Sequence, residues 1–157
     1  MAAKNNAEEI YSIAKSLIGL KAWNVVKLYG YSSVIDFGKP TRNHVGNIIG
    51  EQQVYLQHTY RIEVGNEVIV TSFSAAANSK NAEAIEQIKS KQLEEVEIIE
   101  PSLDTVFIFE DNLKVFVYNA YFEGGADLAA WRYIYPVNNV LRVGPGPKYT
   151  IDSYFDL

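Results

Sequence analysis

Cysteine is absent from this 157-residue sequence, and histidine occurs only at His44 and His58. Without cysteine the chain has no disulfide framework, no thiolate zinc site and no cysteine nucleophile. The two histidines are 14 residues apart and have no local carboxylate pattern beside them. Calcium-binding and phosphate-binding loop motifs are also missing. We therefore expect no metal site and no cofactor.

Motifs for nucleophilic catalysis are missing as well. The sequence contains neither a G-x-S-x-G elbow nor an S-x-x-K motif in a suitable context. A carboxylate pair such as Glu110 with Glu123 would need a set separation in a cleft, which spacing along the chain does not provide. We expect no catalytic residues and a protein that is not an enzyme. An enzyme that uses paired carboxylates is kept as an alternative to this expectation.

Long apolar runs are lacking too. No segment approaches the ~18 apolar residues that a membrane-spanning helix needs. The N-terminal segment mixes Glu8, Glu9 and Lys15 with apolar residues at helical spacing, which is unlike a signal peptide. These features predict a soluble, cytoplasmic protein that has no membrane partner.

Basic residues are scarce in the second half of the chain. Residues 81–157 contain six Lys or Arg against thirteen Asp or Glu, whereas residues 1–80 contain eight against six. A negative field repels nucleic acid and favours a basic protein partner. The alternative is a solvated acidic surface that only aids solubility.

The residues that are present indicate a globular domain with two helices. Hydrophobic residues make up 48% of the chain and aromatic residues 13%. Apolar residues at helical spacing predict a helix over residues 6–18. They are Ile10, Ile13, Ala14, Leu17 and Ile18. A shorter helix is expected over residues 81–92.

Alternating β-branched and aromatic residues predict the strands. The expected strands are 23–29, 34–37, 54–64 as one continuous strand, 67–73, 94–99 and 140–143. Residues 39–50 are expected to form an exposed loop. The Gly144–Pro147 segment is expected to stop further pairing, because proline cannot donate to a sheet, and to leave a peripheral tail.

The segment from Asp104 to Pro136 is the strongest structural signal. Two alternating runs flank Asp111-Asn112, which is the pattern of a β-hairpin, and a further strand carries Trp131. The fold class is therefore α+β, a mostly antiparallel multi-stranded sheet with an N-terminal helix and one shorter mid-chain helix. The chain is expected to form a single domain over residues 1–157.

The candidate partner-binding residues combine the acidic run with aromatic side chains, because Tyr and Trp often dominate interfaces. They are Glu94, Glu95, Glu97, Glu110, Asp111, Tyr118, Trp131 and Tyr133. The sequence leaves open whether both faces of the aromatic strands are covered internally or one face meets a partner.

The order of these elements resembles a loose group of small, uncharacterised bacterial α+β proteins, some of which are proposed toxin-immunity proteins. The matching residues are Leu17-Ile18-Gly19, Trp23, Tyr60-Arg61-Ile62, Phe109-Glu110, Leu113 and Trp131, within about residues 10–135. The group supplies no catalytic residue, so the resemblance implies a non-enzymatic role.

We therefore expect a non-enzymatic protein-binding module, with an immunity-type inhibitor of a basic effector as its specific form. In this hypothesis the acidic run steers the encounter and the aromatic residues supply affinity. The alternative is a small apolar-ligand carrier with a pocket between sheet and helix.

Overall fold

The computed structural model describes residues 6–28, 32–57, 59–72, 79–119, 129–136 and 138–153. Its helical elements are α1 (Asn6–Ala14), the 3-10 turn η1 (Lys15–Leu17) and α2 (Ser79–Glu86). Its strands are β1 (Ala22–Lys27), β2 (Ser33–Arg42), β3 (Ile48–Leu56), β4 (Thr59–Val64), β5 (Glu67–Thr71), β6 (Leu93–Ile99), β7 (Asp104–Phe109), β8 (Leu113–Tyr118), β9 (Trp131–Tyr135), β10 (Asn139–Val143) and β11 (Tyr149–Ser153).

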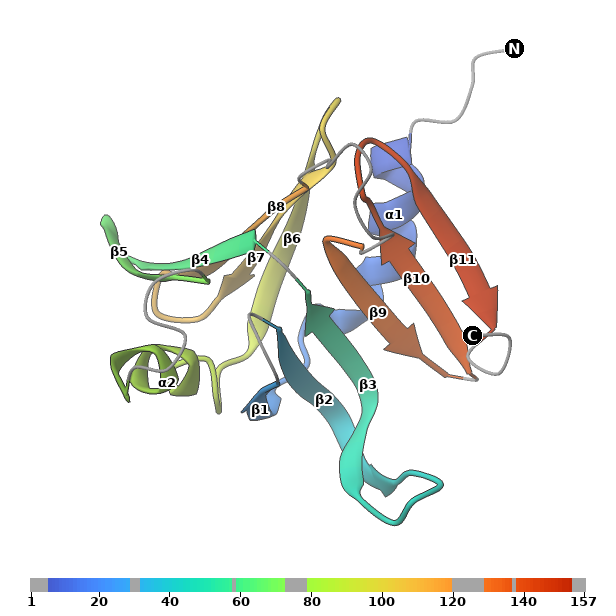
Figure 1. Cartoon of the computed structure of the whole chain (residues 1–157), viewed down its shortest axis with the longest axis horizontal. Coiled ribbons are helices and arrows are strands. Elements are labelled where there is room, and N and C mark those ends of the chain that lie inside the picture. The colour runs from blue at the N-terminus through green and yellow to red at the C-terminus, as the bar shows by residue number, and fades with distance from the viewer. Residues whose placement is uncertain are drawn as a thin grey trace.

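The strands form two antiparallel sheets (Figure 1). Sheet 1 has the strand order β1-β2-β3-β9-β10-β11, and sheet 2 has the order β5-β4-β8-β7-β6. The predicted α+β class with mostly antiparallel strands is confirmed. The expectation of a single sheet is wrong, because the strands are divided between two sheets.

The chain passes between the sheets where the sequence predicts one long strand over residues 54–64. β3 pairs with β9 in sheet 1, whereas β4 pairs with β8 in sheet 2. The backbone N–H of Gln57 donates to the carbonyl of Ala130 at 3.1 Å, which joins the ends of β3 and β9 at this corner. Alternation does not reveal the break, because Leu56 and Tyr60 both face the shared core. His58, which the sequence places on the apolar side of this strand, lies outside the described residues.

The two sheets pack face to face through aromatic side chains. Phe37 of sheet 1 stacks on Phe109 of sheet 2 with 6.3 Å between ring centroids. Phe107 meets Trp131 edge to face at 5.1 Å, and the indole N–H of Trp131 donates to Thr105 Oγ1 at 2.9 Å. These five side chains are buried. The hydrogen bond to Thr105 therefore gives the indole N–H an acceptor inside an otherwise apolar interface.

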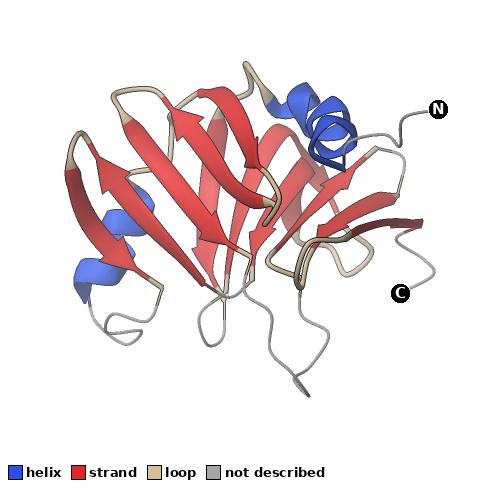
Figure 2. Ribbon diagram, turned by 90° about the horizontal axis from the view of Figure 1, so that it is seen from above, coloured by secondary structure: helices blue, strands red, loops and turns tan. Residues whose placement is uncertain are grey.

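The helices lie at opposite ends of this pair of sheets, as Figure 2 shows. α1 packs against β6 and β10, and buries Ile10 and Ala14. α2 packs against β1 and β5, which are edge strands of sheets 1 and 2. Both predicted helices are present, but the second covers residues 79–86 rather than 81–92. One hydrophobic cluster includes residues from both helices and both sheets.

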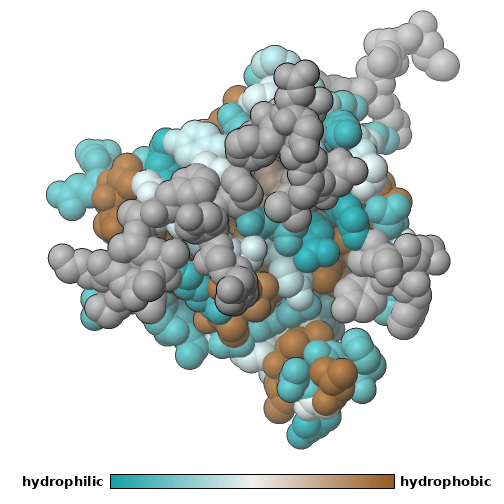
Figure 3. Space-filling model, viewed as in Figure 1, coloured by the Kyte–Doolittle hydropathy of each residue, from teal (hydrophilic) through white to brown (hydrophobic). Residues whose placement is uncertain are grey.

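The β2–β3 hairpin is longer than the sequence predicts. Strand pairing extends to Arg42 and resumes at Ile48, so the expected loop over residues 39–50 shrinks to residues 43–47. The Asn43 side chain accepts hydrogen bonds from the backbone N–H groups of Val45 and Asn47. Val45 and Ile48 are exposed, and hydrophobic colour appears at the far end of this hairpin in Figure 3.

The C-terminal segment also differs from the prediction. The chain reverses through residues 144–148, where the N–H of Gly144 donates to the carbonyl of Lys148 at 2.8 Å. β11 then pairs along the whole of β10. The expectation that pairing stops is wrong, because both prolines lie in the turn and neither removes a hydrogen bond from the ladder.

The predicted hairpin at Asp111-Asn112 is confirmed. β7 and β8 pair in register on either side of these residues. Asp111 has φ 62° and Asn112 has φ 57°, the left-handed pair that a type I′ turn requires.

Candidate interaction surface

The outer face of sheet 2 carries a row of side chains that points away from the core. On β8, the buried Leu113, Val115 and Val117 alternate with more accessible residues, as the sequence predicts. Strand pairing aligns Arg61 with Phe116, Phe116 with Val106, and Val106 with Glu97. The row therefore crosses β4, β8, β7 and β6 in that order.

Arg61 covers two aromatic rings in this row. Its guanidinium carbon lies 4.5 Å from the centroid of Phe116 and 5.1 Å from that of Tyr118. The two rings are themselves 4.8 Å apart, and Arg61 Nε lies 3.5 Å from Glu63 Oε2. Cation–π contact and the ion pair hold the arginine flat against the sheet. We call Arg61, Phe116 and Tyr118 the aromatic platform.

The acidic residues of β6 lie on an edge strand of sheet 2, and β7 separates them from this platform. Glu97 is exposed on the outer face, and Glu94 is exposed at a bulge between Leu93 and Glu95. Neither Glu94 nor Glu97 has a hydrogen bond or ion pair to a residue that the structure describes. Their charges therefore face solvent.

Glu95 is used differently. Its Oε1 atom accepts hydrogen bonds from the Tyr11 hydroxyl at 3.0 Å and from the backbone N–H of Val96 at 2.9 Å. The hydrogen bond to this carboxylate raises the pKa of Tyr11 above its ordinary value, because losing the proton would place two negative charges together. Glu95 thus ties α1 to β6.

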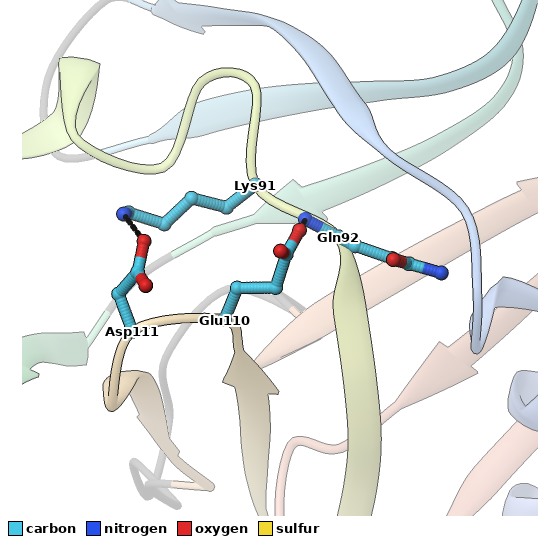
Figure 4. Close-up of polar contacts among 4 residues, drawn as sticks. All are labelled: Lys91, Gln92, Glu110 and Asp111. Atoms are coloured by element: carbon cyan, nitrogen blue, oxygen red, sulfur yellow. Dashed lines mark hydrogen bonds and ion pairs between the residues drawn. The ribbon is translucent and has the colours of Figure 1, made fainter.

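Glu110 and Asp111 clamp the start of β6 to the β7–β8 turn (Figure 4). Glu110 Oε1 accepts the backbone N–H of Gln92 at 2.5 Å, and the N–H of Glu110 donates to the carbonyl of Gln92 at 3.0 Å. Asp111 Oδ2 lies 2.8 Å from Lys91 Nζ. These two carboxylates therefore already have donors within the chain.

Two of the predicted contact residues are in the core. Trp131 and Tyr133 are 0% exposed, which leaves them no surface for a partner. The Tyr133 hydroxyl lies 2.6 Å from Ser16 Oγ and also donates to Gln52 Oε1. Burial raises the pKa of Tyr133 to about 12.

Of the eight predicted site residues, the structure brings Glu97 and Tyr118 onto one face. Sequence reasoning missed Arg61 and Phe116 as parts of this surface. Alternation places Phe116 beside Tyr118 on the correct face, but the contact with Arg61 depends on the register of β4 against β8, which no local pattern encodes.

Within the described residues, no group of three His, Asp or Glu side chains could hold a metal ion. No helix among them is long and apolar enough to cross a membrane. Comparisons of the chain with family models, with curated proteins and with solved structures find no match. The resemblance to small bacterial proteins stays a prediction.

Proposed function

We propose that this protein is a non-enzymatic binding protein whose partner is a basic protein that docks on the outer face of sheet 2. The observation that carries the proposal is that the aromatic platform shares the outer face of sheet 2 with the solvent-facing Glu97, which lies beyond Val106 of β7. The exposed Glu94 lies further along the same edge strand. Tyr and Arg are the residue types that most often dominate binding energy, and each buries a large area with a polar tip.

The two kinds of residue would do different work. Exposed glutamates attract a basic partner through solvent and raise the association rate, an effect that salt screens. Phe116 and Tyr118, held by Arg61, supply a rigid apolar contact that slows dissociation.

An immunity-type inhibitor is the specific form of this proposal that the sequence resemblance favours. Its basic partner would then be a toxin whose active surface is covered by the docked protein. A purified partner whose activity falls on addition of one equivalent of this protein would support that form.

The alternative of a small apolar-ligand carrier has less support. At the expected place between sheet and helix, Ile10, Ala14 and Leu17 are fully buried. The contact between the sheets is filled by Phe37, Phe107, Phe109 and Trp131. An apolar ligand would have to displace these packed side chains, which costs several kcal/mol for an aromatic residue.

The test is affinity capture from the cells of origin with three baits. They are the wild-type protein, the double variant Glu94→Lys/Glu97→Lys, and the control Glu83→Lys/Glu86→Lys. The control makes the same charge change at exposed positions near α2. We expect a basic partner that the wild type and the control retain at low salt and the Glu94/Glu97 variant loses.

The captured partner is then purified and its binding measured against Phe116→Ala. A loss of affinity that lies mainly in the dissociation rate supports the platform. Equal retention of the partner by all three baits, or no basic partner at low or high salt, would show that sheet 2 is not the docking face.

A further inference from the structure

We propose that a basic cleft on sheet 1 binds a small molecule that carries a phosphate group. The cleft has a volume of about 480 Å³ and opens beside β9, β10, β11 and the turn at residues 144–148. The polar side chains that line it include Arg132, Arg142, Lys148, Thr150 and Asp152. It is separate from the aromatic platform, which belongs to the other sheet.

The strand register brings the cations together. Trp131 and Tyr133 of β9 and Leu141 and Val143 of β10 face the core, so Arg132 and Arg142 between them face outward. Arg132 and Arg142 are directly opposite each other on the paired strands. Like charges in that position destabilise a sheet unless a counter-charge lies between them.

Neighbouring side chains hold these arginines in place. The guanidinium of Arg132 lies 4.7 Å from the centroid of the Tyr55 ring, and Tyr55 is its cross-strand neighbour on β3. Arg142 is flanked on its other side by Thr150 of β11. Arg132, Arg142 and Thr150 thus form one wall of the cleft across β9, β10 and β11, and Tyr55 of β3 supports Arg132 beside it.

Arg142 has donor capacity left over. Its Nε atom is buried and makes no hydrogen bond to a described residue; it lies 3.8 Å from Asp152 Oδ2, beyond hydrogen-bond length. That same carboxylate oxygen accepts the Thr150 hydroxyl at 3.2 Å. The Nε atom itself is closed to solvent, but the Arg142 side chain is 29% exposed, so its terminal guanidinium nitrogens are the donors that would meet an anion in the cleft.

The charge of the cleft matches a phosphate ester. Arg132, Arg142 and Lys148 supply three positive charges, and Asp152 is the one carboxylate among the described lining residues. Cationic side chains at these positions suit a phosphate monoester, which carries about −1.5 to −2 at neutral pH. Guanidinium groups also match the geometry of phosphate oxygens.

The test is a titration followed by the backbone amide NMR signals of Gly144 to Asp152. The probes are inorganic phosphate, glycerol 3-phosphate and adenosine 5′-monophosphate, with acetate at matched ionic strength as the monoanion reference. We expect saturable shifts confined to this segment and to the adjoining strands β10 and β9. Tighter binding of either ester than of inorganic phosphate would show that the cleft also contacts the rest of the ligand.

Two pairs of variants locate the site. Arg142→Gln is expected to weaken phosphate binding roughly 10- to 100-fold, the effect of losing a charge-assisted hydrogen bond. Its control is Arg42→Gln on the β2–β3 hairpin. Lys148→Gln removes an exposed charge without disturbing the fold, and its control is Lys114→Gln on sheet 2.

Four results would overturn the assignment. The first three are shifts with acetate equal to those with phosphate, equal losses in Arg142→Gln and Arg42→Gln, and no saturable binding of any small phosphate at tens of millimolar. Binding to phosphatidylglycerol vesicles without binding to the small phosphates would also overturn it, in favour of a membrane surface.

Discussion

Sheet 2 and sheet 1 use their charged residues in opposite ways. In the acidic region around β6, several carboxylates accept hydrogen bonds or pair with lysine within the chain, as Glu95, Glu110 and Asp111 do. In the basic cleft of sheet 1, Arg132 and Arg142 lie side by side, and Asp152 is the one carboxylate among the described residues that line the cleft. The number of charged residues in a region therefore does not tell how many of them are available to a partner.

The net charge of the chain does not show this difference between the two sheets. The chain carries −5 overall, and its second half carries the acidic excess. The basic cleft nevertheless lies in that half, because β9 to β11 hold Arg132, Arg142 and, in the turn, Lys148. The protein therefore has an acidic surface on sheet 2 and a basic surface on sheet 1.

The largest loss of stability should come from removing a side chain at the contact between the two sheets. Trp131→Ala removes the indole that contacts Phe107 and Thr105 across the interface, so it should lower the free energy of unfolding by about 3–5 kcal/mol. Tyr118→Ala on the outer face should cost about 1 kcal/mol. Chemical denaturation measures both, and equal costs would contradict the assignment of Trp131 to the core and Tyr118 to the surface.

The second prediction concerns the buried face of β9, behind the basic cleft. Burial raises the pKa of Tyr133 from 10.0 to about 12, so the folded state holds its proton more tightly than the unfolded state does. The resulting stability is fully present below pH 10 and is lost as the pH rises through about 12. By linkage, the loss is roughly 2–3 kcal/mol.

The measurement is the free energy of unfolding of the wild type and of Tyr133→Phe between neutral and alkaline pH. The other tyrosines with raised pKa remain in both proteins, so the difference isolates Tyr133. We expect the wild type to lose its advantage over the variant at alkaline pH. A constant difference across that range would show that Tyr133 ionises normally in the folded protein.

Much of this architecture could be predicted from local sequence, and the reason is physical. The Asp111-Asn112 turn depends on two adjacent residues that tolerate positive φ, and the first helix depends on spacing within three turns. The division into two sheets was not predictable, because alternation records which side chains are buried and not which sheet buries them.

The surfaces were less predictable than the fold for a related reason. The arginine pair of the cleft depends on the register of β9 against β10, and the clamp at Glu110 joins residues 18 apart in sequence. Trp131 and Tyr133 look alike to a pattern that scores aromatic content, whether they fill a core or meet a partner. Only tertiary packing places them inside, Trp131 against Phe107 of sheet 2 and Tyr133 beside Ser16 of η1.

The third prediction separates the carboxylates of the clamp. Glu110→Ala leaves the backbone N–H of Gln92 without its side-chain acceptor, and should cost about 1 kcal/mol. Asp111→Asn breaks a pair whose carboxylate side chain is 78% exposed, keeps a residue that tolerates the positive φ of the turn, and should cost less. Thermal unfolding at low and high salt distinguishes them. A larger loss for Asp111→Asn would mean that the lysine pair, and not the Glu110 contact, holds β6.

The smallest expected effect on stability belongs to the residues that we assign to the partner. Glu94→Lys/Glu97→Lys should change the free energy of unfolding by no more than about 0.5 kcal/mol, because neither side chain has a partner among the described residues. The same variant should slow association with the captured basic partner at low salt, and the difference from the wild type should shrink as salt rises. Stopped-flow association rates across a salt series make the measurement.

Glu110→Ala should do the reverse. It should lower the stability and leave the association rate nearly unchanged. The two variants therefore divide the acidic region into carboxylates that hold the fold and carboxylates that contact the partner. A Glu94/Glu97 variant that destabilises the protein as much as Glu110→Ala would remove that division.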